Sequence, residues 1–250
     1  MSGSLSVIGL GPGNPQTLTP EAAAALGAAD ALYGYGPYLD RVPSRAGQTR
    51  HASDNREESA RAAAALRHAS EGAHVALVSG GDPGVFAMAA AVCEQIESGD
   101  TAWRKLDVAV VPGVTAMLAV AARVGAPLGH DFCAMSLSDN LKPWELIERR
   151  LAAAAGAGFV IALYNPISRA RPWQLGKAFE LLRQHLPAST PVIFGRADEK
   201  VAVGPLDAVD PSAADMATLI IVGSALTRVI DRPGLAPLVY TPRSADGAGT

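Results

Sequence analysis

The stretch that decides the fold reads SGGDPGVF and spans residues 79–86. Residues 74–78 before it are apolar and rich in valine, which is typical of a buried strand. Residues 86–97 after it repeat apolar side chains at helical spacing, which predicts a helix. A strand, a glycine turn and a helix in this order present backbone N–H groups to a ligand. Because the two adjacent glycines remove every Cβ from the turn, a ligand can lie directly on the main chain.

Asp82 and Pro83 also fit the start of that helix, with the aspartate as its N-cap and the proline at its first position. Such a start needs no ligand, so these residues have a purely structural interpretation as well. It does not require the two glycines that precede it, however. We therefore favour a ligand site in this turn.

Length and composition exclude several classes of protein. The 250 residues suffice for one large domain or two small ones, and 49% hydrophobic residues provide a sizeable core. The net charge is -3 and no basic run resembles a nucleic-acid footprint, so we expect no nucleic-acid partner. No apolar stretch reaches the roughly 18 residues of a membrane span, and the N-terminus lacks the pattern of a signal peptide. These features predict a cytoplasmic protein with no membrane partner.

The two cysteines, Cys93 and Cys133, lie far apart in apolar segments. Neither has a partner at the spacing of metal ligands. We therefore expect two buried, reduced thiols and no metal site.

Strands and helices alternate along both halves of the chain, which predicts two α/β domains. Strands are expected at residues 5–10, 31–33, 74–78, 106–111, 132–136, 159–163, 191–195, 200–203, 219–222 and 238–240. Helices are expected at residues 20–29, 56–67, 86–97, 116–124 and 173–185, and up to residue 155 after a polar loop at 138–145. A glycine- and proline-containing segment at residues 125–130 is interpreted as a hinge. The predicted domains are thus residues 1–124 and residues 125–243, followed by a disordered tail over residues 244–250.

A second glycine turn, GPGNP at residues 11–15, follows the first expected strand. It fails the dinucleotide fingerprint, because Asn14 occupies the position of the third glycine and two prolines prevent a helix from starting there. The turn is either a ligand contact of another kind or a rigid connection.

Five motifs in this order resemble the tetrapyrrole methylases, which transfer a methyl group from S-adenosylmethionine. They are GLGPG at residues 9–13, GGDP at 80–83, PGVTA at 112–116, LYNP at 163–166 and TLIIVG at 218–223. The resemblance extends over residues 4–243. Within the family, two further motifs are similar to the branch that methylates C-17 of a corrin precursor in cobalamin biosynthesis. These are SLSD at residues 136–139 with PW at 143–144, and YNPISR at 164–169.

The resemblance implies two α/β domains with the cofactor in a cleft between them, and a homodimer. It also implies that methylation of a tetrapyrrole at C-17 is coupled to contraction of the macrocycle, which gives precorrin-4. S-adenosylmethionine would be the methyl donor and S-adenosylhomocysteine the product. The residues that the resemblance places at the cofactor are Pro12, Gly80, Gly81, Asp82, Val85, Phe86, Thr115, Ala116, Tyr164, Asn165 and Thr218.

Methyl transfer from a sulfonium needs positioning and the exclusion of water rather than a nucleophile and its base. Ring contraction needs proton movement, because an alcohol becomes a carbonyl as a carbon–carbon bond migrates. The acid–base candidates are His130, Asp139, Asp198 and Glu199. His130 fits a surface histidine equally well, Asp139 fits a turn residue, and the last two fit a solvated hairpin tip.

A tetrapyrrole carries many carboxylates, whereas this chain is net acidic, so attraction to the substrate must be local. Arg169 and Arg171 are the strongest candidates for binding those carboxylates, and Lys142 is a weaker one. For Arg41 and Arg45 we favour a solvated loop.

Three functions remain open from the sequence. The chain is the corrin-pathway methyltransferase, or a methylase of the same fold with another substrate such as uroporphyrinogen or a cobalt-bearing intermediate, or a tetrapyrrole carrier without turnover. Tyr35, Tyr38 and Trp144 fit either the lining of a macrocycle site or ordinary packing. A carrier has no need of the glycine loops, which disfavours that third function.

Overall fold

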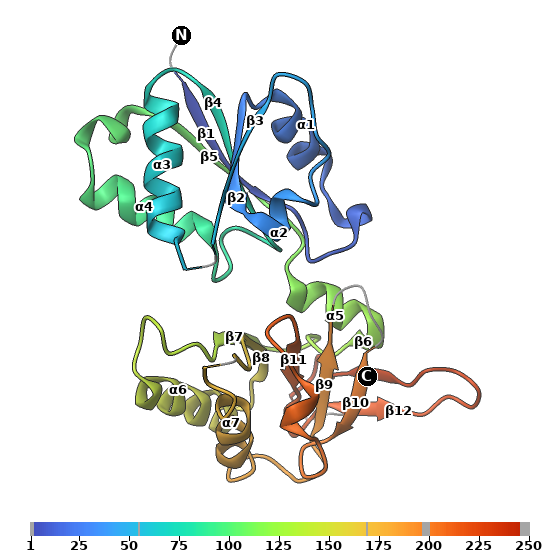
Figure 1. Ribbon diagram of the computed structural model, residues 1–250. Coiled ribbons are helices and arrows are strands. Elements are labelled where there is room, and N and C mark those ends of the chain that lie inside the picture. The colour runs from blue at the N-terminus through green and yellow to red at the C-terminus, as the bar shows by residue number, and fades with distance from the viewer. Residues whose placement is uncertain (1–2, 55, 169, 197–200, 246–250) are drawn as a thin grey trace. The chain divides into compact units, whose positions relative to one another are not determined.

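The computed structural model describes residues 3–54, 56–168, 170–196 and 201–245. Its contacts divide the chain into two units, Met1–Ala116 and Met117–Thr250. Each unit has its own sheet and its own apolar core (Figure 1). The predicted α/β class is confirmed.

The first unit is built on a parallel sheet. Its strands are β1 (Ser4–Gly9), β2 (Ala31–Tyr35), β3 (Thr49–Ser53), β4 (His74–Ser79) and β5 (Asp107–Val111). They lie in the order β3-β2-β4-β1-β5. Its helices are α1 (Pro20–Ala28), α2 (Gly36–Leu39), α3 (Glu58–Ser70) and α4 (Met88–Ser98), with short 3-10 helices at Pro15–Thr17 and Thr101–Lys105. Because the strands are parallel, the loops after β1, β4 and β5 share one edge of the sheet.

Helices cover both faces of this sheet, with α3 and α4 on one face and α1 and α2 on the other (Figure 1). Side chains of the central strands alternate between the two resulting cores. Leu5 and Val7 of β1 pack with α3 and α4, whereas Ile8 packs with α1 and α2. Burial on both faces explains why β4 is a nearly continuous apolar run.

One predicted helix start is confirmed and one is wrong. Thr19 caps α1, since its Oγ1 accepts the N–H of Ala22 at 3.1 Å. Asp82 does not cap the helix after β4, because α4 begins only at Met88. Its carboxylate instead accepts the N–H of Gly84 at 2.8 Å and that of Gly113 at 3.0 Å. Asp82 thus makes a local turn bond to Gly84 and a second bond to the end of another strand, without starting a helix.

The second unit contains a mixed sheet and a small additional sheet. Its strands are β6 (Gly125–Ala126), β7 (Phe132–Ser136), β8 (Val160–Tyr164), β9 (Pro191–Gly195), β10 (Ala202–Pro205), β11 (Leu219–Val222), β12 (Arg228–Ile230) and β13 (Leu238–Tyr240). Its helices are α5 (Ala116–Val124), α6 (Trp144–Gly156) and α7 (Gln174–Leu182), with a 3-10 helix at Pro211–Ala213.

The larger sheet has the order β10-β9-β11-β8-β7, and the smaller one has the order β12-β13-β6. In the larger sheet, as far as the described residues show it, β7 and β8 pair in parallel. The pairs β8 with β11, β11 with β9, and β9 with β10 are antiparallel. Helices α6 and α7 pack on this sheet, and Phe179 of α7 is fully buried in their common core (Figure 1). Tyr164 therefore ends, and Asn165 follows, a strand that is paired on both sides.

The contacts place α5 in the second unit, whereas the sequence places the boundary after Val124. The side chain of Val120 fills the space beside β9, because a Cβ at Gly195 would lie 2.6 Å from its Cγ1. The N–H of Met117 donates to the Tyr164 hydroxyl at 3.2 Å. The expected hinge at residues 125–130 contributes β6 to the smaller sheet.

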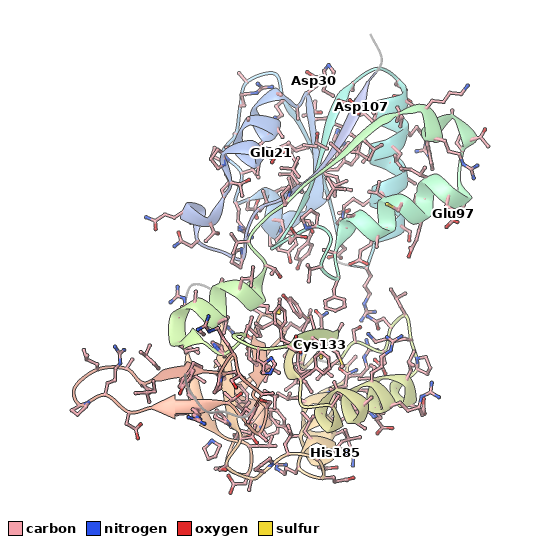
Figure 2. The ribbon with its side chains drawn as sticks, turned by 180° about the vertical axis from the view of Figure 1, so that it is seen from behind. Glu21, Asp30, Glu97, Asp107, Cys133 and His185 are labelled. Carbon is pink, nitrogen blue, oxygen red and sulfur yellow. The ribbon has the colours of Figure 1, made fainter. Side chains whose placement is uncertain are left out.

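Some local expectations differ from the structure. The strand expected at residues 31–33 extends to Tyr35, and the short helix α2, which was not predicted, follows it and places the Tyr38 ring against Gly80. Cys93 is exposed on α4 rather than buried, while Cys133 is half-buried in β7 (Figure 2). Across the residues that the structure describes, no helix is long and apolar enough to cross a membrane.

Candidate functional site

Four glycines at the ends of β1, β4 and β5 pack backbone against backbone, and we call Gly9, Gly11, Gly81 and Gly113 the glycine junction. Gly11 and Gly81 exchange two N–H···O bonds of 3.1 and 2.9 Å. A Cβ at Gly113 would lie 2.3 Å from the carbonyl oxygen of Gly81, and a Cβ at Gly9 would lie 2.7 Å from the nitrogen of Gly113. Gly9 and Gly113 therefore have to be glycine for the strand ends to approach this closely.

The two glycines of the GGDP turn are needed for different reasons. Gly81 has a φ of +68°, a conformation that favours glycine, while the nearest atom to its absent Cβ is 3.9 Å away. A Cβ at Gly80 would instead lie 2.6 Å from Cζ of Tyr38. Gly81 is thus needed for its backbone conformation, whereas the Cβ position of Gly80 is occupied by the tyrosine ring.

Asp82 and Phe86 frame the rest of this turn. The bonds from Gly84 and Gly113 to the Asp82 carboxylate tie the turn after β4 to the end of β5. Phe86 has a φ of 52° and leaves half of its side chain exposed. A bulky residue in this conformation is uncommon and concentrates at functional sites.

All cofactor candidates of the first unit lie on three loops at one sheet edge. These are Pro12 after β1, then Gly80, Gly81, Asp82, Val85 and Phe86 after β4, and Thr115 and Ala116 after β5. Thr115 is buried, and Pro12 and Val85 are half-buried. The structure thus brings together residues that are more than a hundred positions apart in the chain.

Arg41 contacts the same edge, although the sequence favours a solvated loop for it. One guanidinium nitrogen, Nη2, donates to the carbonyl oxygens of Leu10 at 2.8 Å and Gly11 at 2.9 Å. Arg45 likewise donates to the carbonyls of Gly27 and Ala29, at the end of α1. Sequence reasoning missed both roles, because the partners are backbone atoms that carry no sequence signal.

In the second unit, Asn165 has a φ of 51° and donates from Nδ2 to the Ser136 hydroxyl at 2.9 Å. The hydroxyl of Tyr164 accepts the N–H of Met117. The loops after β7 and β8 are thereby held together where the two parallel strands end. The two predicted cofactor residues lie at a strand end, as in the first unit.

Asp139 and Arg171 were predicted for different tasks, and the structure pairs them with each other. Arg171 donates to Asp139 and to Asn140, and Gln174 donates to the same carboxylate at 2.9 Å. Both charged side chains are about four-fifths buried, with exposed fractions of 23% and 20%. Arg171 is therefore engaged with a protein carboxylate rather than with solvent. Arg169 lies outside the described residues.

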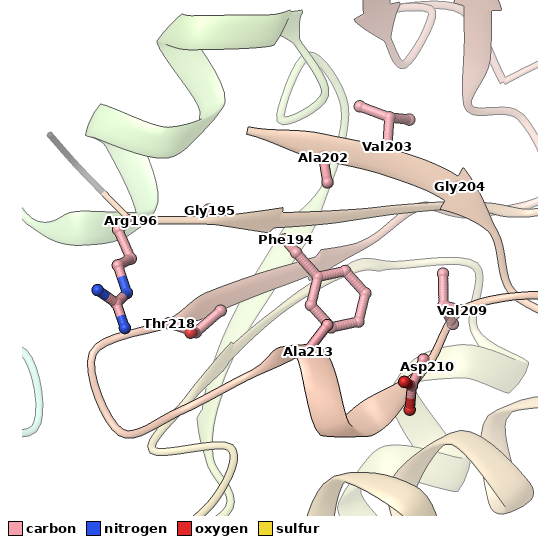
Figure 3. Close-up of a pocket in the computed structure, with 10 residues that line it drawn as sticks. All are labelled: Phe194, Gly195, Arg196, Ala202, Val203, Gly204, Val209, Asp210, Ala213 and Thr218. Atoms are coloured by element: carbon pink, nitrogen blue, oxygen red, sulfur yellow. The ribbon is translucent and has the colours of Figure 1, made fainter. Parts of the chain in front are cut away.

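Thr218 borders a cavity of about 310 Å³ in the second unit (Figure 3). The cavity is lined by Phe194, Gly195, Arg196, Ala202, Val203, Gly204, Val209, Asp210, Ala213 and Thr218. The Thr218 hydroxyl donates to Asp215 at 2.8 Å, and Asp215 in turn pairs with Arg196. Sequence reasoning did not single out Arg196, although its position directly after β9 was the available signal. Asp198 and Glu199 lie outside the described residues.

The remaining predicted residues lie in the loops before β7 and α6. Nδ1 of His130 is 3.9 Å from the carboxylate of Asp131, which is strongly exposed. Lys142 is half-buried, and this burial, followed by the nearby positive charge of Arg150, lowers the pKa of its amine. Among the described residues, no group of three or more His, Cys, Asp or Glu side chains is arranged to hold a metal ion.

Comparison with known proteins identifies the family of this chain. The family model of the Tetrapyrrole (Corrin/Porphyrin) Methylases matches residues 4–210. A precorrin-3B C(17)-methyltransferase of Sinorhizobium sp is 64% identical over 252 residues, which cover 99% of each chain. A probable cobalt-factor III C(17)-methyltransferase of Salmonella typhimurium is 43% identical and covers 95% of this chain and 99% of its own.

Solved structures of methyltransferases are also similar to this chain. The crystal structure of the methyltransferase CobJ is similar with a TM-score of 0.91 and 46% identity, covering 96% of this chain and 100% of its own. Uroporphyrin-III C-methyltransferase from Thermus thermophilus, complexed with S-adenosylhomocysteine, has a TM-score of 0.65 and 25% identity, covering 89% and 98%. The chain therefore belongs to the tetrapyrrole (corrin/porphyrin) methylases and is a methyltransferase.

Proposed function

We propose that this methyltransferase methylates C-17 of precorrin-3B and contracts the macrocycle to precorrin-4 in cobalamin biosynthesis. The observation that carries the proposal is the 64% identity, over 99% of both chains, to the Sinorhizobium precorrin-3B C(17)-methyltransferase. The likeness to CobJ along the whole of that chain supports it.

We further propose S-adenosylmethionine as the methyl donor. In the transfer, the bond from sulfur to the methyl carbon breaks, a bond from that carbon to C-17 forms, and S-adenosylhomocysteine leaves as a neutral thioether. Such a reaction needs a close-fitting, dry site more than it needs a catalytic base. The relative solved with S-adenosylhomocysteine supports this choice.

We assign the cofactor to the three loops of the first unit together with Tyr164, Asn165 and Thr218 of the second. For ring contraction we retain His130 as the acid–base candidate. Asp139 accepts bonds from Arg171 and Gln174 and is poorly placed to exchange a proton with a ligand. Arg169 and Lys142 are the cations that we retain for a substrate carboxylate, and Lys142 is half-buried in the loop before α6. A homodimer in the cytoplasm belongs to the same proposal.

A cobalt-bearing substrate is the second candidate, because the Salmonella relative named for cobalt-factor III is 43% identical over nearly its full length. Because 43% identity is lower than 64%, we favour precorrin-3B over cobalt-factor III as the substrate.

The purified protein should be incubated with methyl-labelled S-adenosylmethionine and, separately, with precorrin-3B, cobalt-factor III and uroporphyrinogen III, and the products analysed by mass and absorption spectra. We expect label in precorrin-3B together with the spectrum of a contracted ring. Faster labelling of cobalt-factor III would replace the first candidate with the second. Binding of a tetrapyrrole without label transfer would identify a carrier and contradict both.

A further inference from the structure

We propose that Arg41 is a positioning residue for the methyl-donor site, which it serves by fixing the loop after β1 against the turn after β4. This inference rests on the proposed function, because it takes these two loops as cofactor-binding elements. Arg41 itself is not assigned a contact with cofactor or substrate.

The first observation is the geometry of the guanidinium. Nη2 of Arg41 donates to two successive carbonyl oxygens, those of Leu10 at 2.8 Å and Gly11 at 2.9 Å. Two carbonyls that point toward one nitrogen repel each other unless a cation lies between them, and charge-assisted bonds of this kind are the stronger class of hydrogen bond. Arg41 thus stabilises a backbone shape that the loop would not hold alone.

The second observation is what that shape does. The Gly11 carbonyl oxygen also accepts the N–H of Gly81 at 2.9 Å, so both of its lone pairs are used. Gly11 returns the bond through its own N–H, which donates to the Gly81 carbonyl oxygen at 3.1 Å. The position of Gly81, which the proposed function places at the cofactor, is therefore coupled to that of Gly11. Pro12, the other candidate on this loop, directly follows Gly11.

The third observation is that the segment from Tyr38 to Arg41 also contacts the turn after β4 through a second side chain. Tyr38 of α2 lies against Gly80, and Cζ of Arg41 lies 6.0 Å from the centre of the Tyr38 ring. The guanidinium of Arg41 therefore holds the loop after β1, and the ring of Tyr38 packs against the turn after β4.

The test compares Arg41→Met with Arg41→Lys and with Arg45→Met. Arg45 is the matched control because its guanidinium also donates to backbone carbonyls, those of Gly27 and Ala29, at the end of α1. Calorimetry measures the affinity for S-adenosylhomocysteine, and steady-state kinetics measure KM for S-adenosylmethionine and for the tetrapyrrole separately. Circular dichroism and thermal unfolding report whether each variant is folded.

We expect Arg41→Met to weaken S-adenosylhomocysteine binding about tenfold or more, as for loss of a charged hydrogen-bonding group. The KM for S-adenosylmethionine should rise accordingly while the KM for the tetrapyrrole stays unchanged. Arg41→Lys should recover part of the affinity, since an ammonium keeps the charge but is too short to lie between both carbonyls. Arg45→Met should lose stability without losing cofactor affinity.

Unchanged affinity in a folded Arg41→Met protein would overturn the inference, as would an equal loss in Arg45→Met. If Arg41→Met fails to fold, Arg41→Lys decides, and wild-type affinity in that variant overturns the inference too. Failure of the unaltered protein to bind S-adenosylhomocysteine is a separate result, which would contradict the proposed function itself.

Discussion

At Gly113 the structure leaves no space for a single methyl group. The atom that an added Cβ would meet is the Gly81 carbonyl oxygen at 2.3 Å, and backbone cannot rotate away as a side chain does. Gly176 of α7 is the opposite case, because nothing lies within 4 Å of its absent Cβ. The same residue type thus has two physical meanings in this chain.

We therefore predict that Gly113→Ala destabilises the protein by about 1–3 kcal/mol or more through overpacking. Gly176→Ala should stabilise it by about 0.5–1 kcal/mol, because alanine loses less conformational entropy in a helix. Urea unfolding of both variants measures the difference. A neutral Gly113→Ala substitution would show that the strand ends can separate without cost and would contradict the packing described here.

At the scale of elements, the outermost strand β3 of the first sheet contributes to a cluster of titratable aromatic rings. His51 of β3 stacks on Tyr33 of β2 with ring centroids 4.3 Å apart, and the His68 ring of α3 lies 5.8 Å from that of His51. Burial, and secondarily the charge of His68, lowers the pKa of His51 from its usual 6.5. The Tyr33 hydroxyl is 3.2 Å from Nδ1 of His68, so the three rings form one cluster.

The sign of the pH effect follows from this lowered pKa. Between that value and 6.5 the unfolded state binds more protons than the folded state, so stability is full above 6.5 and falls as the pH falls. We predict that His51→Phe, which keeps the stacking but not the charge, weakens the decline of the urea midpoint on acidification from about pH 7 to about pH 5. His185→Gln, at an exposed histidine of the second unit, serves as the control (Figure 2). An unaltered pH profile in His51→Phe would contradict the prediction.

Strands with an apolar sequence were predictable, whether central or at an edge, and the polar edge strand β3 was not. β4, β8 and β11 are apolar runs because both of their faces are covered. β3 has the sequence TRHAS and lies at the edge of its sheet, so no apolar pattern marks it.

Predictions at the candidate site divide in the same way. The positions of the loops follow from the glycine motifs, since these stand directly after strands. The partners within the loops do not, because Asp82 bonds to Gly113 and Asp139 bonds to Arg171 across 31 and 32 residues of sequence. Local capping rules cannot anticipate a competitor that only the tertiary structure supplies.

At the scale of the whole molecule, each buried apolar cluster belongs to one unit. Two clusters cover the two faces of the first sheet, and a third, which includes Leu175 and Phe179, lies in the second unit. A core residue of one unit therefore stabilises that unit most directly.

We predict that Leu175→Ala, which removes a fully buried side chain at a cost of about 2–5 kcal/mol, accelerates amide hydrogen exchange in the second unit. Peptides from β1 and β4 should exchange as in the unaltered protein. Hydrogen exchange followed by mass spectrometry gives both readings in one experiment. Equal acceleration in the two units would mean that they unfold as one cooperative body.

The glycine junction has a consequence for engineering. Loops at strand ends are usually the parts that can be exchanged between relatives without disturbing the scaffold. Here three such loops are interlocked through their main chains, so a graft of one loop brings in a backbone path that the other two must accommodate. Redesign of this edge, for a different donor or a bulkier donor analogue, has to transplant the connections after β1, β4 and β5 as one cassette.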